Sequence, residues 1–191
     1  MINALLDHVT TVLEFNSEIR RQQEQAHGED YCVIHDAIRK YMADCDSYME
    51  LGTHQGGTAS VAMLCKPKKI YLVDLDTSKY NNKLSSLATQ FCTEHDIELN
   101  VKQCDSTSFM SVNSTDMLVI DSYHHPAHML KELNMHGNNV KKYILAHDTT
   151  SLLGKQNDSL YRCLKNWASE NHFVEIERGE TNVGYVVFKR N

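Results

Sequence analysis

The chain has 191 residues, of which 41% are hydrophobic and 23% are charged, and its formal net charge at pH 7 is −6. This length suits one α/β domain with a single core, and the composition excludes a disordered chain. The acidic balance lacks the basic footprint of nucleic-acid-binding proteins, so we expect no clear nucleic acid binding.

The sequence carries no pattern of a membrane or secreted protein. No apolar run approaches the roughly 20 residues of a membrane helix, so no membrane contact is expected. The N-terminus lacks the basic start and apolar stretch of a signal peptide. The cysteines form no CxxC pair, and we expect reduced thiols in a cytoplasmic protein. They are Cys32, Cys45, Cys65, Cys92, Cys104 and Cys163.

Two helices are predicted before the first strand. Apolar residues recur at helical spacing over residues 4–25 and again over Asp30–Met42, and Gly28 separates the two segments. We therefore treat residues 1–44 as an N-terminal helical unit. It could serve as a lid over a substrate or as an interface in a homo-oligomer.

From residue 47 to residue 170 predicted strands alternate with predicted helices, which implies a parallel sheet with right-handed crossovers. The last two strands flank a glycine-containing turn and form an antiparallel hairpin. The fold class is therefore α/β: a doubly wound, Rossmann-like, mostly parallel seven-stranded sheet with a C-terminal antiparallel hairpin. The predicted strands are 47–51, 70–73, 97–104, 117–120, 143–146, 173–177 and 183–189, and the helices between them are 58–65, 81–95, 126–135 and 160–170.

A glycine-rich turn follows the first strand, in the segment Glu50-Leu51-Gly52-Thr53-His54-Gln55-Gly56-Gly57-Thr58. Glycines let the backbone turn sharply and approach a ligand closely, and the helix that follows can stabilise a carboxylate or phosphate at its N-terminus. The spacing differs from the Gly-x-Gly-x-x-Gly of dinucleotide enzymes. An ordinary strand–helix turn, with glycines for packing, is the alternative interpretation.

Acids at the next two strand ends strengthen the ligand-binding interpretation. Asp74 ends the second strand, in the position where ribose hydroxyls are held. Asp76 is a weaker duplicate that could simply cap the next helix. Asp105 and Ser106 close the third strand, near the adenine ring by fold analogy. Helix capping explains Asp105 equally well.

The fourth and fifth strands end in a group of acids and histidines. Adjacent strand ends bring Asp121 close to Asp148, with His147 beside them. Two carboxylates and an imidazole can hold Mg²⁺ or Mn²⁺, with iron or zinc as alternatives, although strand-end aspartates also cap helices. His124 can reach the same cleft and act as a general base.

Two neighbouring histidines receive a lesser role. His125 and His128 are predicted to lie on the surface of the following helix. The spacing of His124 and His128 could suggest a zinc-binding helix, but the glutamate that a metalloprotease needs between them is absent.

The glycine turn, Asp74, Asp121 with His124, and His147-Asp148 follow one another along the chain. Taken together, they resemble the small class I S-adenosylmethionine-dependent methyltransferases over residues 45–190. They are most similar to the family of cephalosporin-hydroxylase-like proteins and metal-dependent sugar O-methyltransferases of macrolide pathways. The fourth strand of that family typically reads Ile-Asp-Gly-Asp-His, and Ile120-Asp121-Ser122-Tyr123-His124 keeps the Asp and the His. The acidic pair that the sugar enzymes carry at the fifth strand end is replaced by His147-Asp148.

The resemblance implies a role for each matching residue. S-adenosylmethionine would be the cofactor, and residues 45–191 would form its binding domain. Asp74 would bind the ribose, Asp121 and Asp148 a metal, and His124 would be the base. Glu50, Gly52 and Gly57 would surround the amino-acid part of the cofactor. The other residues of the expected cofactor site are Thr53, Gly56, Asp105 and Ser106.

Three functions remain open at this point. The first is O-methylation of a hydroxyl on a small molecule or sugar, assisted by a metal. The second is a Rossmann-like module that binds an adenosine ligand without chemistry. The third is a nicotinamide-dependent oxidoreductase, against which the glycine spacing and the C-terminal hairpin both argue.

Overall fold

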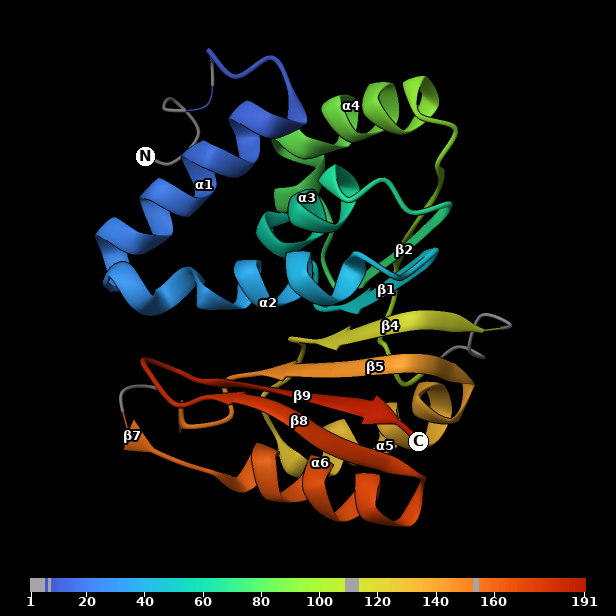
Figure 1. Ribbon diagram of the computed structural model, residues 1–191. Coiled ribbons are helices and arrows are strands. Elements are labelled where there is room, and N and C mark those ends of the chain that lie inside the picture. Colours follow the sequence, from blue (N-terminus) through green and yellow to red (C-terminus); the bar gives the residue numbers. More distant parts are fainter. Residues whose placement is uncertain (1–5, 7, 109–113, 153–154) are drawn as a thin grey trace.

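The computed structural model describes residue 6 and residues 8–108, 114–152 and 155–191. A seven-stranded sheet lies between two layers of helices (Figure 1). The strand order is β3-β2-β1-β4-β5-β9-β8, in which β1 to β5 are parallel and β9 is antiparallel to both of its neighbours. The predicted fold class is confirmed. The strands are β1 (Ser47–Leu51), β2 (Lys69–Asp74), β3 (Glu98–Gln103), β4 (Thr115–Ile120), β5 (Val140–His147), β8 (Phe173–Gly179) and β9 (Tyr185–Arg190).

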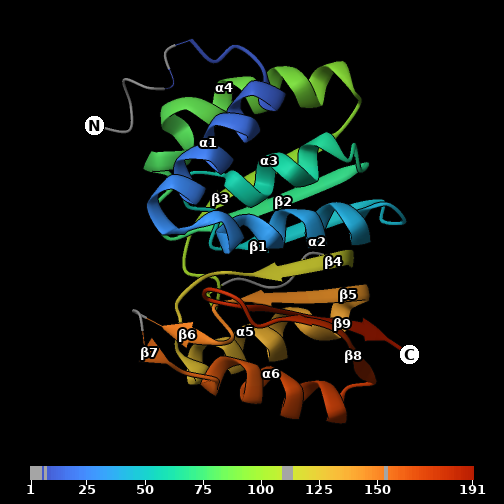
Figure 2. The same cartoon turned by 60° about the vertical axis from the view of Figure 1, so that its left-hand side comes forward.

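Helices cover both faces of this sheet (Figure 2). One face carries α1 (Val12–His27), α2 (Val33–Met42), α3 (Gly57–Leu64) and α4 (Ser78–Glu94), and the other carries α5 (Pro126–His136) and α6 (Ser159–Glu170). Short 3₁₀ turns precede α2 (Glu29–Cys32) and follow α5 (Gly137–Asn139). A two-stranded pair, β6 (Ser151–Leu152) with β7 (Lys155–Gln156), was not predicted.

The first helix begins later than its apolar pattern predicts. Residues 4, 5 and 7 of the predicted segment lie outside the described residues, and α1 starts at Val12. The cause is a capping box: Thr11 Oγ1 accepts a hydrogen bond from Glu14 N at 3.1 Å, and Glu14 Oε2 accepts one from Thr11 N at 3.2 Å. Gly28 ends the helix at φ 101°, with its N–H donating to Glu24 O.

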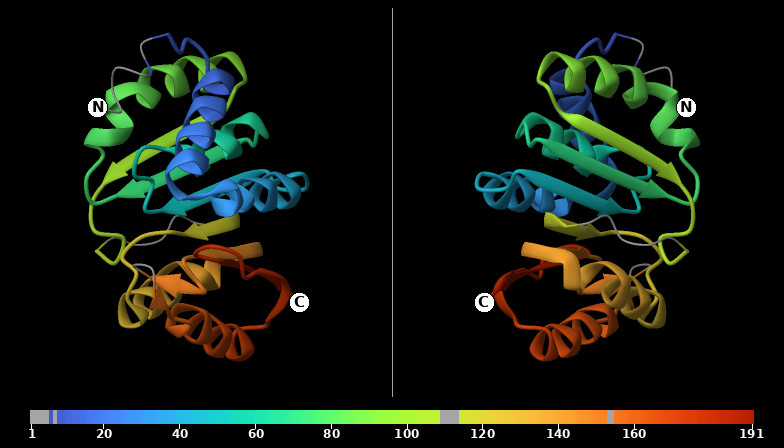
Figure 3. Two further views of the ribbon diagram at one scale, coloured as in Figure 1. Left: turned by 90° about the vertical axis from the view of Figure 1, so that its left-hand side faces the viewer. Right: turned by 90° about the vertical axis from the view of Figure 1, so that its right-hand side faces the viewer.

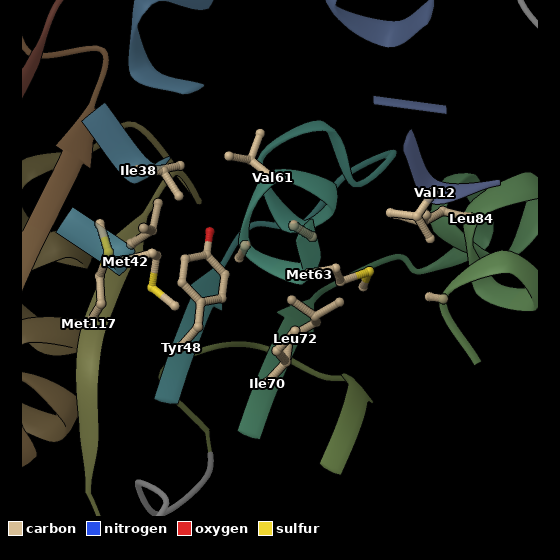
Figure 4. Packing of buried hydrophobic residues seen from close by; sticks show 14 of the residues in the cluster. Val12, Ile38, Met42, Tyr48, Val61, Met63, Ile70, Leu72, Leu84 and Met117 are labelled. Atoms are coloured by element: carbon tan, nitrogen blue, oxygen red, sulfur yellow. The ribbon is translucent and has the colours of Figure 1, made fainter. Parts of the chain in front are cut away.

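The strands divide their side chains between two cores, as expected for a parallel sheet covered on both faces. In β1, Tyr48 faces the α1–α4 layer and Met49 faces the α5–α6 layer. Figure 4 shows Tyr48 with Met42 of α2 on one side and Met63 of α3 on the other. The N-terminal helices thus share a core with the sheet. Whether they act as a lid or an interface stays a prediction.

The two ends of the chain also touch. Lys40 and Tyr41 of α2 both contact the Glu177 carboxylate on β8, and Asn182 Nδ2 donates to His27 O at 2.8 Å. Figure 3 shows α1 beside α3 and α4, on the layer opposite α6. Within the described part of the chain, no helix has both the length and the apolar character that crossing a membrane requires.

Candidate active site

A cavity of about 760 Å³ opens where β1, β2, β4 and β5 end. This volume lies in the range of small-molecule sites, and the carboxyl ends of parallel strands are where such sites form. Its walls come from the N-terminal helices, the glycine turn and the strand ends. The lining residues include Tyr31, Ile34, His35, Gly52, Thr53, His54, Gly57, Thr58, Asp74, Asp105, Ser106, Asp121, Ser122, His124, His128, His147 and Asp148.

Two glycines of the turn are required by space as well as by backbone conformation. Gly52 has φ +91°, and a Cβ there would lie 2.1 Å from the backbone oxygen of Asp121. Gly56 has φ +89°, and a Cβ would lie 2.2 Å from the Leu84 side chain. A side chain at Gly52 would therefore push apart the ends of β1 and β4, which carry the two sides of the cavity.

Most of the predicted cofactor residues line the cavity, but Glu50 and Gly56 do not. The Glu50 carboxylate is fully buried between β1 and α3, where it accepts hydrogen bonds from the Tyr48 hydroxyl and from Thr58 Oγ1. Burial raises the pKa of Glu50 to about 8, although both hydrogen bonds oppose the shift. Its visible role is to join the strand to the helix.

Asp74 closes the loop that surrounds it. Its carboxylate accepts hydrogen bonds from His54 N at 2.6 Å and from Asp76 N at 2.9 Å, so one side chain orders both the glycine turn and the end of β2. Asp76 accepts from Ser78 N at 2.9 Å and caps the start of α4, as the alternative interpretation of that residue predicted. Asp105 makes a similar local turn through Thr107 N.

The ends of β4 and β5 bring together four residues that we call the strand-end cluster: Asp121, His124, His147 and Asp148. His124 Nε2 lies 2.9 Å from Asp148 Oδ2 and 3.4 Å from Asp121 Oδ1. His147 Nδ1 lies 3.3 Å from Asp121 Oδ1 and 3.4 Å from Asp148 Oδ2. Asp148 takes φ 54°, a left-handed conformation that is unusual for a residue with a side chain.

The strand-end cluster keeps its charges. Hydrogen bonds to Asp121 and Asp148 raise the pKa of His124 to about 10. Burial would lower the pKa of His147, but the same two carboxylates raise it to about 10. Burial would likewise raise the pKa of Asp121 and Asp148, yet the facing imidazoles hold both below their ordinary range. Two anions and two cations therefore balance in this geometry.

The donor set suits a divalent cation. One ligand atom each from Asp121, His124 and Asp148 lies within 4.8 Å of the other two, so a single ion could reach all three. His147, the imidazole predicted as a ligand, lies against the same two carboxylates. An imidazole binds a metal only in its neutral form, so ion binding would release a proton from the cluster.

A second polar group, the helix α5 cluster, consists of Ser106, Ser122, His128 and Glu132. Glu132 Oε1 accepts hydrogen bonds from Ser106 Oγ and Ser122 Oγ, and His128 Nε2 lies 3.3 Å from the same oxygen. Burial raises the pKa of Glu132 against these hydrogen bonds. Sequence reasoning missed this cluster. The one signal was the i, i+4 pair of histidine and glutamate on a predicted helix.

The structure corrects the interpretation of the histidines near this helix. His125 is the N-cap of α5 and accepts a hydrogen bond from Ala127 N at 3.3 Å. His124 therefore precedes the helix, as the predicted helix 126–135 has it, and the zinc-binding helix that the sequence analysis rejected has no helical pair to support it. His128 was predicted on the helix surface, but it lines the cavity.

The N-terminal unit, for which the sequence suggested a lid or an interface, contributes Tyr31 and His35 to the cavity wall, two residues that the sequence did not single out. The Tyr31 ring stacks on His27 at 4.4 Å and lies edge-on to His147 at 5.9 Å. His35 is 2% exposed, and its Nδ1 has no hydrogen-bond partner among the described residues. Burial lowers the pKa of His35 to about 4, so the imidazole is uncharged at neutral pH.

Comparison with known proteins rests on structure alone. No family model and no curated protein matches the sequence. The magnesium protoporphyrin IX methyltransferase of Synechocystis PCC 6803, solved with bound S-adenosylhomocysteine, superposes with a TM-score of 0.65 at 9% identity, covering 100% of this chain and 92% of that one. The fold is that of this methyltransferase.

Two further structures support the same conclusion about the fold. A Staphylococcus aureus protein proposed to be a caffeoyl-CoA O-methyltransferase gives a TM-score of 0.65 at 10% identity, over 100% of this chain and 97% of that one. The N-methyltransferase NodS of Bradyrhizobium japonicum WM9 gives 0.57 at 11%, over 83% and 94%. At these identities the likeness defines the architecture, a Rossmann-like methyltransferase fold.

Proposed function

We propose that this protein transfers a methyl group from S-adenosylmethionine to a hydroxyl oxygen of a small molecule or sugar. The observation that carries the proposal is the cavity itself. It lies at the strand ends of a methyltransferase fold. The glycine turn and Asp74 line it at the ends of β1 and β2, and the strand-end cluster lines it at the ends of β4 and β5. The adenosine-binding module without chemistry is the alternative, and the strand-end cluster disfavours it.

The cofactor would bind along β1, β2 and β3. The Asp74 carboxylate would accept hydrogen bonds from the ribose hydroxyls. Gly52 and Gly57 let the backbone approach the amino-acid part, whose carboxylate would lie at the N-terminus of α3. Asp105 and Ser106 would lie near the adenine ring. Glu50 would act indirectly, by fixing β1 to α3.

The strand-end cluster would prepare the acceptor. A divalent cation, Mg²⁺ or Mn²⁺, held by Asp121, Asp148 and an imidazole would lower the pKa of an acceptor hydroxyl. We assign the third ligand position to His147 and the proton-accepting role to His124, which lies 2.9 Å from Asp148. Beside the two carboxylates alone the pKa of His124 is about 10 and the imidazole is charged, so it would accept a proton only once a bound cation offsets those carboxylates. Holding the acceptor oxygen in line with the methyl group is an orientation effect of the cavity walls.

Calorimetric titration with S-adenosylhomocysteine, with and without Mg²⁺ or Mn²⁺, tests the proposal. We expect micromolar binding, and about a tenfold loss in Asp74→Ala, because one acid would hold the ribose. Asp76→Ala is the matched control, since Asp76 caps α4 two residues away, and its affinity should stay within twofold. Absence of binding to the wild type would exclude the methyltransferase, and equal loss in both variants would exclude the ribose role.

Separate readouts address the other assignments. Ion binding by His147→Ala and His124→Ala tells which imidazole is the metal ligand.

Tight cofactor binding without transfer to any acceptor, with or without metal, would favour the binding module. Six free cysteines support a cytoplasmic location, and homo-oligomer formation through the N-terminal helices remains to be tested by light scattering.

A further inference from the structure

The cavity has a side that the cofactor proposal leaves unused. Because β1 lies between β2 and β4, a cofactor bound along β1, β2 and β3 occupies one half of the sheet edge. The other half, at the ends of β4 and β5, carries the strand-end cluster, and Tyr31 lies against His147 there. Ile34 and His35 line the same cavity. This inference rests on the proposed function, since it concerns the methyl acceptor.

Two polar side chains of the N-terminal segment, Tyr31 and His35, line the cavity four residues apart. The Nδ1 atom of His35 is buried and has no hydrogen-bond partner among the described residues. Burying a polar group without a partner costs free energy. Because His35 is only 2% exposed, its ring nitrogen lacks water as well as a protein partner. A molecule bound in the cavity could supply the missing hydrogen bond.

Tyr31 and His35 line the same cavity as the strand-end cluster. The Tyr31 ring lies edge-on to His147 at 5.9 Å, which places it beside the strand-end cluster. Ile34, a buried apolar residue, lines the same cavity. An acceptor whose reacting oxygen lies at Asp121 and Asp148 would therefore meet Tyr31 and His35 with its remaining polar atoms.

The charge of the lining limits what the acceptor can be. The described residues that line the cavity include no lysine and no arginine. Phosphate and carboxylate groups are usually bound by such side chains. The two imidazoles of the strand-end cluster are already paired with carboxylates. An anionic acceptor would thus enter a site with two carboxylates and no uncommitted cation.

We propose that Tyr31 and His35 bind the methyl acceptor, and that the acceptor is an uncharged hydroxyl compound. Tyr31 and His35 would determine which acceptor binds, while the strand-end cluster would act on the oxygen that receives the methyl group. His27 is the matched control, because it stacks on Tyr31 from outside and does not line the cavity.

The test uses two pairs of probes that differ in charge: glucose with glucose 6-phosphate, and catechol with 3,4-dihydroxybenzoate. Formation of S-adenosylhomocysteine from S-adenosylmethionine is measured with each. We expect kcat/KM for the neutral member of at least one pair to exceed that for its anionic partner at least tenfold. Tyr31→Phe and His35→Ala should each raise the KM for that acceptor about tenfold, the effect of one neutral hydrogen bond, while His27→Ala leaves it unchanged.

The outcomes separate this inference from the proposed function. Unchanged acceptor KM in Tyr31→Phe and His35→Ala overturns the assignment, as does preference for the anionic probes or no transfer to any of the four by a protein that binds S-adenosylhomocysteine. Tyr31→Phe retains the ring, so the test does not depend on His35→Ala folding. Failure of the wild type to bind S-adenosylhomocysteine would instead remove the proposed function.

Discussion

The strand-end cluster and the helix α5 cluster both join carboxylates to histidine beside one cavity, yet their electrostatics are opposite. In the first, two imidazoles keep Asp121 and Asp148 charged. In the second, Glu132 is surrounded by serine hydroxyls and burial raises its pKa. Asp121 and Asp148 each face two imidazoles, whereas Glu132 faces one. A charged group can act on a ligand, whereas an acid held by hydroxyls mainly holds loops together.

Substitution of an acid in the strand-end cluster should give the largest effect. We expect Asp121→Ala to lower methyl transfer about 10³-fold, because proton removal and metal binding are lost together. S-adenosylhomocysteine affinity should change little. Glu132→Gln, which keeps the shape of the other acid, should retain most activity. Full activity in Asp121→Ala would contradict the proposed role of the cluster.

Loss of the acid in the helix α5 cluster should instead reduce stability. Glu132→Ala removes the partner of one buried hydroxyl, Ser106, and one half-buried hydroxyl, Ser122, and leaves a void, so we expect the free energy of unfolding to fall by about 3 kcal/mol. Urea denaturation measures this. Glu180→Ala, at an exposed turn, is the control and should stay within about 0.5 kcal/mol. Wild-type stability in Glu132→Ala would show that the cluster does not hold its loops.

Glu50 resembles Glu132 in being a buried acid with hydroxyl donors, and its pKa gives a pH window. The folded pKa is raised to about 8 from an ordinary value of 4.5, so the folded state binds the extra proton between these values. Stability from this group is therefore lost as pH rises from 4.5 to 8, by up to about 1.4 kcal/mol per pH unit. Glu50→Gln should lack this loss. Parallel pH profiles of unfolding free energy for the two proteins would contradict the assignment.

The smallest expected effect comes from a single donor. Ser122→Ala removes one of the hydroxyls that Glu132 accepts from, while Ser106 and His128 remain. We expect a loss of about 1 kcal/mol in unfolding free energy, the value of one hydrogen bond. A loss as large as that of Glu132→Ala would mean that Ser122 alone sustains the cluster. Chemical denaturation of both variants side by side decides this.

Much of the fold follows from local pattern. Apolar strands that each end in an acid predict the sheet, its parallel core and the meeting of Asp121, His147 and Asp148, because strand ends lie at one edge. Gly52 was predictable from its turn, although its contact with the Asp121 backbone was not. The capping-box pattern Thr11-x-x-Glu14 indicates the start of α1 in the sequence. The predicted start at residue 4 relied instead on the spacing of apolar residues.

The missed residues depend on how distant elements pack. Ser106 and Ser122 follow different strands, and they meet Glu132 only because α5 turns that side chain inward. Tyr31 and His35 look like ordinary helix residues, and they become cavity wall because the 3₁₀ turn Glu29–Cys32 and the start of α2 lie near the strand ends, where Tyr31 meets His147. No local spacing encodes such contacts. The same applies to Glu50, which was expected at the cofactor but fills the space between β1 and α3.

The meeting of the chain ends has a consequence for synthesis on the ribosome. Lys40 contacts Glu177 across a separation of 137 residues, and His27 accepts a hydrogen bond from Asn182. At a translation rate of about 5–20 residues per second, the N-terminal helices wait several seconds for their final partners. The nascent chain can form its early strands in that time. The segment that carries Tyr31 and His35 gains its support from β8 and the turn before β9 only after Glu177 and Asn182 have been synthesised, so we expect no activity from a nascent chain that lacks them.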